Sequence, residues 1–150
     1  MSSTITLTSK QISALNTFLR GEMSAVETYN QALGQSITDQ DGSLAENRDC
    51  HARRVSFLQD KIISAGGEPD SSSGTWGNFA AMVEKSASLI SDQMVLNALE
   101  EGEDHGLKMY RNSDEDDETL SEMVHVHLLP AQIGTHERMR RLKAAGAQDR

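Results

Sequence analysis

Two glutamates stand where the sequence predicts the inside of a helix. Glu22 and Glu103 each interrupt a run of apolar residues that recur at steps of three and four. An isolated carboxylate in such a place is costly, because it must be neutralised, paired or bound to a cation. His51 and His136 fall on the inward stripes of two other predicted helices. Two carboxylates with two imidazoles form a ligand set that suits iron, zinc or manganese.

The two glutamates belong to an internal repeat with the pattern G-E-x6-Y. Its two copies cover residues 21–29 and 102–110. In each half of the chain a His-x-Arg follows on the next predicted helix, at His51 and at His136. Duplication explains this arrangement better than chance. The repeat therefore predicts that each half gives one glutamate and one histidine to a common centre.

Two helices are predicted in the first half of the chain. The first covers residues 8–33, with a capping box at 8–11 and Gly34 as its stop. The second begins at a capping box over 43–46 and ends at 66–67. The predicted inward residues are Ile12, Leu15, Leu19, Glu22, Val26, Tyr29 and Leu33 in the first helix, and Leu44, Asn47, His51, Val55, Leu58, Ile62 and Ala65 in the second.

The second half begins with a Pro-, Ser- and Gly-rich segment at 68–74, which predicts a long connection rather than a tight turn. A third helical region over 76–110 bends or restarts at 91–92, and a capping box at 119–122 begins the last helix. Pro130 must kink or restart that helix, because proline has no amide proton. The predicted inward residues are Trp76, Phe79, Val83, Ile90, Leu96, Leu99, Glu103, Leu107 and Tyr110, then Leu120, Val124, Leu128, Ile133, Met139 and Leu142.

Two helical hairpins joined by a crossover, each with one inward glutamate and one histidine, are the layout of ferritin-like bundles. The sequence thus predicts an all-α fold, a ferritin-like four-helix bundle, in a single domain over 1–150. Three short motifs point the same way: Gly102-Glu103-Asp104 with Tyr110, Thr135-His136-Glu137 before Met139 and Leu142, and Gly66-Gly67-Glu68-Pro69. Through them the chain resembles, over most of its length, a bacterial family of uncharacterised ferritin-like proteins. That resemblance implies a fold related to rubrerythrin and bacterioferritin, and it implies no activity.

A di-iron centre needs a glutamate three residues before each histidine. Those positions hold Arg48 and Ile133, while Asn47 and Gln132 are weak replacements. An oxidase or peroxidase of the di-iron kind is therefore the least favoured function. The hypothesis kept first is one iron, zinc or manganese ion bound by Glu22, His51, Glu103 and His136.

Two alternatives stay open. Glu122 and His125 form the chain's one literal Glu-x-x-His, and helix rise places His125 about 6 Å and His136 about 10 Å from the level of Glu103. His125 is therefore a rival ligand. A bundle without any ion is as good an interpretation as one with an ion, since histidine, tyrosine, or an arginine such as Arg53 or Arg138 also satisfies a buried glutamate. The protein would then be a structural or interaction bundle, linked to stress and dimeric.

The composition of the chain limits the kinds of partner that we expect it to bind. The net charge of −9 leaves no basic surface for a nucleic acid. The sequence has no apolar segment near the length of a membrane span and no hydrophobic signal core, so a cytoplasmic protein is expected. Cys50 is the only cysteine, which excludes an intrachain disulfide and a thiolate-based zinc site. A homodimer is compatible with the sequence, which does not fix the oligomeric state.

Overall fold

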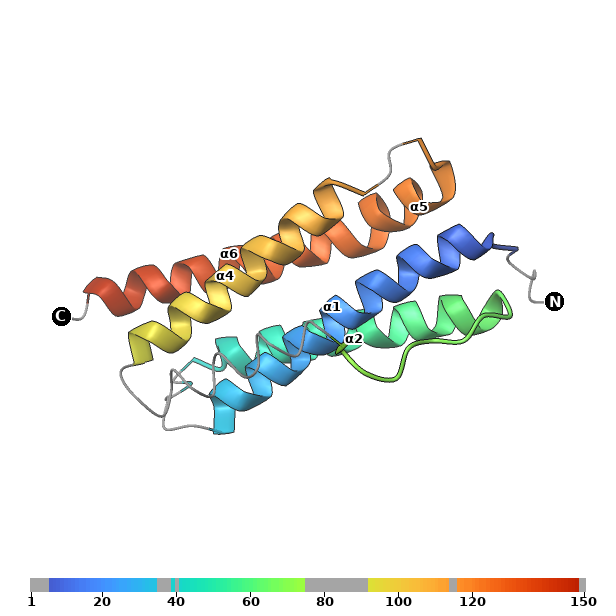
Figure 1. The fold of residues 1–150 in the computed structure, drawn as a ribbon. Helices are drawn as coiled ribbons and strands as arrows, with labels where there is room; N and C mark the ends of the chain where they lie inside the picture. Colours follow the sequence, from blue (N-terminus) through green and yellow to red (C-terminus); the bar gives the residue numbers. More distant parts are fainter. Residues whose placement is uncertain (1–5, 35–38, 40, 75–91, 114–115, 149–150) are drawn as a thin grey trace.

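The computed structural model describes residues 6–34, 39, 41–74, 92–113 and 116–148, which form four helices and no strand. Helices α1 (Ser9–Gly34) and α2 (Ser43–Ser64) make one hairpin. Helix α4 (Asp92–Arg111) makes the other hairpin with a long last helix, in which α5 (Glu118–Met123), the π-helical segment η2 (Val124–Leu128) and α6 (Leu129–Gln148) follow without a break. The hairpins meet through α2 against α6 and α1 against α4 (Figure 1). None of these helices is long and apolar enough to cross a membrane.

The chain that leaves α2 returns along the outside of α1. Asn16 donates from its side-chain nitrogen to the carbonyl of Glu68 (3.1 Å) and accepts from the backbone of Asp70 (2.8 Å). Further on, the hydroxyl of Ser73 donates to the carboxylate of Glu27 (2.9 Å). Residues later in the segment 68–73 contact residues later in α1. The segment therefore runs parallel to α1, as Figure 1 shows.

The predicted inward stripes are largely the buried ones. Their apolar members belong to two clusters, one around Leu15, Leu19 and Leu58 and one around Leu44, Leu99 and Met139. The sequence prediction was wrong for Ile133, which is 45% exposed. Beyond Leu128 the buried stripe takes Gln132 and Thr135 instead, because these continue the steps of three and four. Four of the predicted inward residues lie outside the described residues: Trp76, Phe79, Val83 and Ile90. Of the predicted break at 91–92, only Asp92 is described, and α4 begins there.

One of the three predicted capping boxes is present. The backbone of Thr8 donates to the side chain of Gln11 (2.8 Å), and the backbone of Gln11 donates back to the hydroxyl of Thr8 (3.1 Å). The box predicted at 43–46 was wrong, because the carboxylate of Asp39 accepts from the amides of Leu44 and Ala45 in the first turn of α2 (3.0 Å each). A carboxylate is a stronger acceptor than a hydroxyl at a helix N-terminus.

The box predicted at 119–122 was wrong for the same reason. Helix α5 begins at Glu118, and the carboxylate of Asp117 accepts from the amide of Leu120 (3.0 Å). That carboxylate also accepts from the side chain of Gln11 (3.1 Å), which ties the start of α5 to the start of α1.

The irregularity predicted at Pro130 takes the form of a π-helical turn. The amide of Leu129 donates to the carbonyl of Val124, five residues earlier. In a regular helix the ring of Pro130 would clash with the carbonyl four residues before it. A wider turn directly ahead of the proline relieves that clash, so the helix continues instead of breaking.

We expect Leu58→Ala to lower the free energy of unfolding by about 2–5 kcal/mol, because Leu58 is fully buried in the first apolar cluster and alanine leaves a cavity. Ile63→Ala in the same helix is the matched control, since Ile63 is 59% exposed and should change stability by at most about 0.5 kcal/mol. Denaturant titrations measure both values. Similar losses in the two variants would mean that the inner face of α2 is misassigned.

Candidate functional site

The structure brings three of the predicted site residues together in the centre of the molecule. The ring of His51 lies between the two glutamates, with Nδ1 2.7 Å from Oε2 of Glu22 and Nε2 2.6 Å from Oε1 of Glu103. All three side chains are buried. Because α1, α2 and α4 supply one residue each, the site spans both hairpins.

Each nitrogen of His51 faces a carboxylate oxygen, which only accepts, so these contacts favour a ring that is protonated on both nitrogens. Burial opposes the charge on His51, but the carboxylates of Glu103 and Glu22 outweigh burial and the repulsion of Arg54, so the pKa of His51 is raised. Burial also opposes ionisation of the glutamates. The charges of Arg54 and His51 outweigh it and lower the pKa of Glu22, and His51 and Arg54 lower the pKa of Glu103.

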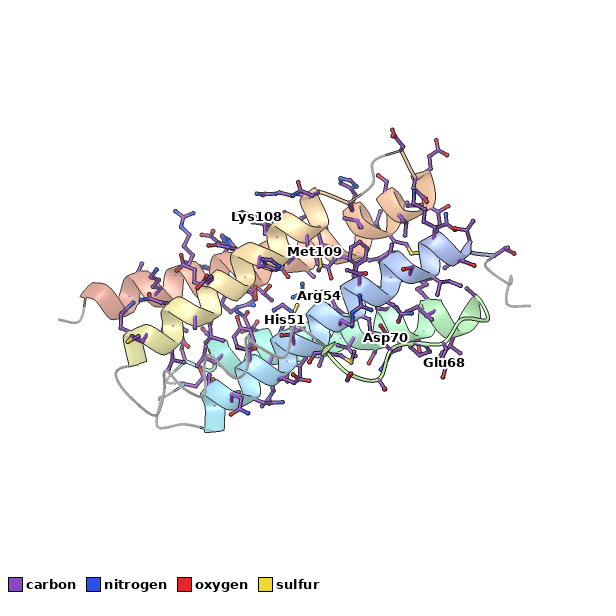
Figure 2. All side chains as sticks on the ribbon, in the orientation of Figure 1. His51, Arg54, Glu68, Asp70, Lys108 and Met109 are labelled. Atoms are coloured by element: carbon purple, nitrogen blue, oxygen red, sulfur yellow. The ribbon has the colours of Figure 1, made fainter. Side chains whose placement is uncertain are left out.

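Arg54 is the functional residue that the sequence reasoning missed. Its guanidinium donates to Oε1 of Glu22 (3.1 Å), to the hydroxyl of Thr135 (3.1 Å) and to the side-chain oxygen of Gln132. Figure 2 places Arg54 and His51 between the two hairpins. Arg54 is only 3% exposed, whereas Arg53, which the sequence suggested as a partner, is exposed. Two carboxylates, one imidazolium and one guanidinium therefore balance in charge.

Two tyrosine hydroxyls form hydrogen bonds between the two halves of the chain. The hydroxyl of Tyr110 on α4 donates to Glu22 on α1 (2.6 Å), and the hydroxyl of Tyr29 on α1 donates to Glu103 on α4 (3.2 Å). Burial, and then the adjacent glutamate, raise the pKa of each tyrosine well above its usual value, so both remain neutral donors. The result is a continuous buried chain from Tyr29 through Glu103, His51 and Glu22 to Tyr110.

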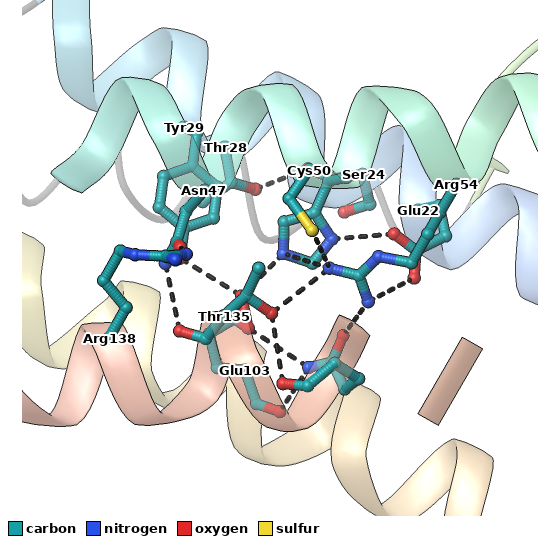
Figure 3. Close-up of polar contacts among 12 residues, drawn as sticks. Glu22, Ser24, Thr28, Tyr29, Asn47, Cys50, Arg54, Glu103, Thr135 and Arg138 are labelled. Carbon is teal, nitrogen blue, oxygen red and sulfur yellow. Dashed lines mark hydrogen bonds and ion pairs between the residues drawn. The ribbon is translucent and has the colours of Figure 1, made fainter. Parts of the chain in front are cut away.

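Amides and hydroxyls close the network on the side of α6 (Figure 3). Gln132 donates to the carbonyl (2.9 Å) and to the carboxylate (3.1 Å) of Glu103. Asn47 donates to the hydroxyl of Tyr29 and to the carbonyl of Thr135 (3.0 Å each), and Arg138 donates to Asn47 (2.7 Å). Arg138 thus contacts the network through Asn47 rather than through a glutamate.

His136 does not join the other three residues. It is partly exposed, and its Nε2 lies 2.5 Å from the carboxylate of Asp104. The rival His125 is exposed and contacts the carbonyl of Ser121 (2.8 Å). The buried polar residues of α6 are Gln132 and Thr135 instead.

The spacing of the repeat identifies these residues as the counterparts of the site residues on α2. Glu103 follows Glu22 by 81 residues, and the same spacing relates Gln132 to His51 and Thr135 to Arg54. The second half of the chain thus has neutral side chains where the first half has the two cations.

The two carboxylates and the imidazole are connected in a line and do not surround a common point. The two nitrogens of one ring point apart, so His51 separates Glu22 from Glu103 instead of joining them around one point. Over the described ranges, no three His, Cys, Asp or Glu side chains are grouped so that they could hold a metal ion.

A cleft between α1 and α4 reaches this network. Its cavity volume is about 40 Å³, room for about two or three water molecules. Small residues form much of its wall, and Glu22, His51 and Glu103 border it. The buried network is therefore next to a small space that a ligand could enter.

Comparison with known families identifies the chain's family. The family model described as "Domain of unknown function (DUF2383)" matches residues 10–116, which include α1, α2 and α4. The chain belongs to this family. No curated protein matches the chain, and no solved structure matches it.

Proposed function

We propose that this protein is a ferritin-like bundle with a metal-free, charge-balanced network at its centre, and that it acts as a structural or interaction module rather than as an oxidase. The observation that carries the proposal is the position of Arg54. Its guanidinium contacts Glu22 and stands 3.3 Å from Nε2 of His51. A cation fixed there repels a divalent ion and supplies the charge that such an ion would supply.

The course of the chain supports the ferritin-like part of the proposal. Helices α1 and α6 run in one direction and α2 and α4 in the other (Figure 1). The connection after α2 must therefore return along the bundle, and residues 68–73 do so along α1. A long crossover between two hairpins is the topology of ferritin-like bundles.

One bound metal ion is the second candidate. Glu22 and Glu103 border the cleft, and both are kept ionised by their surroundings, as ligands of a metal must be. For an ion in the cleft to take Glu22, Glu103 and a deprotonated His51 as ligands, these side chains would have to turn toward one point, away from the chain of contacts that they form here. His136 would have to leave Asp104 to take part.

Glu103→Gln separates the two candidates. In the metal-free network this change leaves the charge of His51 short of a partner, so the free energy of unfolding should fall by more than the roughly 0–1 kcal/mol of an exposed pair. Wild-type protein should carry no stoichiometric metal, and a chelator should not shift its thermal midpoint. Metal analysis and thermal melts with and without chelator measure these quantities.

Glu101→Gln is the matched control, because Glu101 is exposed on the same helix two residues away. It should leave stability and metal content unchanged. Wild-type protein with one ion per chain, lost in Glu103→Gln while the apo-protein keeps its stability, would reject the metal-free network and support the second candidate.

A further inference from the structure

Three exposed apolar residues lie along the outer side of the last helix. They are Val126, which is 58% exposed, Pro130, and Ile133, which is 45% exposed. Steps of four and three residues place them on one side of the helix. Val124 and Leu128, two residues before and after Val126, are fully buried, so Val126 points away from the bundle. The three residues form one apolar surface, which we call the outer strip.

A charged residue of opposite sign lies beyond each end of the outer strip. Glu122 precedes the strip by about one helical turn, and Arg141 follows it by about two. Both side chains are exposed, and neither has an ion-pair partner within the part of the chain that the structure describes. Between the strip and Arg141, Glu137 is exposed too, with its carboxylate 3.7 Å from Arg140. Glu122 and Arg141 are therefore both available to a partner.

This order of residues is complementary to itself when a second copy of the helix runs in the opposite direction. Pro130 and Ile133 lie at equal distances on either side of the point midway between residues 131 and 132, and so do Glu122 and Arg141. A two-fold axis at that point brings Glu122 beside Arg141 of the second copy at both ends, with the apolar residues between. Parallel packing would instead place Glu122 against its own copy. The charges thus favour a second copy of this chain as the partner.

We propose that the protein forms a homodimer in which the last helices of two copies pack antiparallel through the outer strip, with an ion pair between Glu122 and Arg141 of different copies at each end. In this register Val126 packs on the CH₂ groups of Glu137, while Pro130 and Ile133 meet at the centre. One helix face makes a small interface, so a dissociation constant in the micromolar range is expected. The inference goes beyond the proposed function, because it uses the outer surface of the last helix and does not depend on the buried network.

Sedimentation velocity of the full-length protein from about 1 μM to about 500 μM tests the proposal, and the wild type should change reversibly from monomer to dimer. Ile133→Lys should weaken dimerisation at least about tenfold, because it places two charges at the centre of the interface. Ile63→Lys is the matched control, since Ile63 is 59% exposed on α2 and should leave dimerisation unchanged. Circular-dichroism melts check that both variants are folded. A wild type that stays monomeric, or a dimer that Ile133→Lys leaves intact, would overturn the proposal.

Charge reversal tests the antiparallel arrangement. Glu122→Arg alone or Arg141→Glu alone should weaken dimerisation about fivefold, because like charges then meet at both ends. The double variant Glu122→Arg with Arg141→Glu should recover the wild-type dissociation constant, because opposite charges meet again. Single variants that associate as tightly as the wild type, or a double variant that associates as weakly as the single ones, would overturn the proposed pairing.

Discussion

Arg54→Met is expected to lower the free energy of unfolding by about 3–5 kcal/mol, as removal of one partner from a buried ion pair does. The change removes the donors to Glu22, Gln132 and Thr135 at once. It leaves the buried carboxylates with only His51 to offset two negative charges. Denaturant titration at neutral pH of wild type and variant measures the loss.

The neighbouring residue gives a matched control. Arg53→Met removes the same charge from an exposed position on the same helix, and should change stability by at most about 0.5 kcal/mol. The double variant Arg54→Met with Glu22→Gln should regain much of the loss, because it removes the stranded charge as well. Equal losses in the two arginine variants, or no recovery in the double variant, would contradict the central role of Arg54.

The sequence predicted the centre of the site because burial follows helical period. Glu22, Glu103 and His51 each fall on a stripe whose other members are apolar, and all three are buried where that stripe predicts. The tyrosines of the repeat were among the partners considered, and each does donate to a glutamate.

Arg54 was missed because an arginine next to a stripe is usually a solvated residue. Its position contained a signal, since it lies three residues after His51 and so on the same face of the helix. Burial of a guanidinium is stable here only because acceptors from α1 and α6 meet it, and no pattern within α2 reveals them.

The assignment of His136 rested on residue type rather than on spacing. Pairing it with His51 required a shift of four residues between the halves, whereas the spacing of the two glutamates points to Gln132 and Thr135. The capping errors have a similar origin. Asp39 and Asp117 precede the hydroxyls that matched the capping pattern, and a carboxylate supplied by the preceding loop competes more strongly for the same amides.

The charge states of the network predict a stability that falls on both sides of a maximum in pH. The folded pKa values of Glu22 and Glu103 lie below the ordinary 4.5, so their contribution is present above that pH and is lost as pH falls through the lowered values. The folded pKa of His51 lies above the ordinary 6.5, so its contribution is full below 6.5 and is lost as pH rises through the raised value.

The alkaline side of this profile is the more specific test. Asp41 and Asp117 also have lowered pKa values and contribute to the acid side, whereas the raised pKa of His51 acts on the alkaline side. The free energy of unfolding, measured by denaturant titration between about pH 6 and 9, should therefore decline in wild type above pH 6.5.

His51→Gln should be less stable throughout and should lose this decline, because glutamine keeps polar contacts but does not titrate. His125→Gln should keep the decline, since His125 is exposed and lies outside the network. A flat wild-type profile above pH 6.5 would mean that His51 is neutral between the two glutamates. A decline that persists in His51→Gln would assign the pH dependence to another group, and the charge-balanced network would then lack its imidazolium.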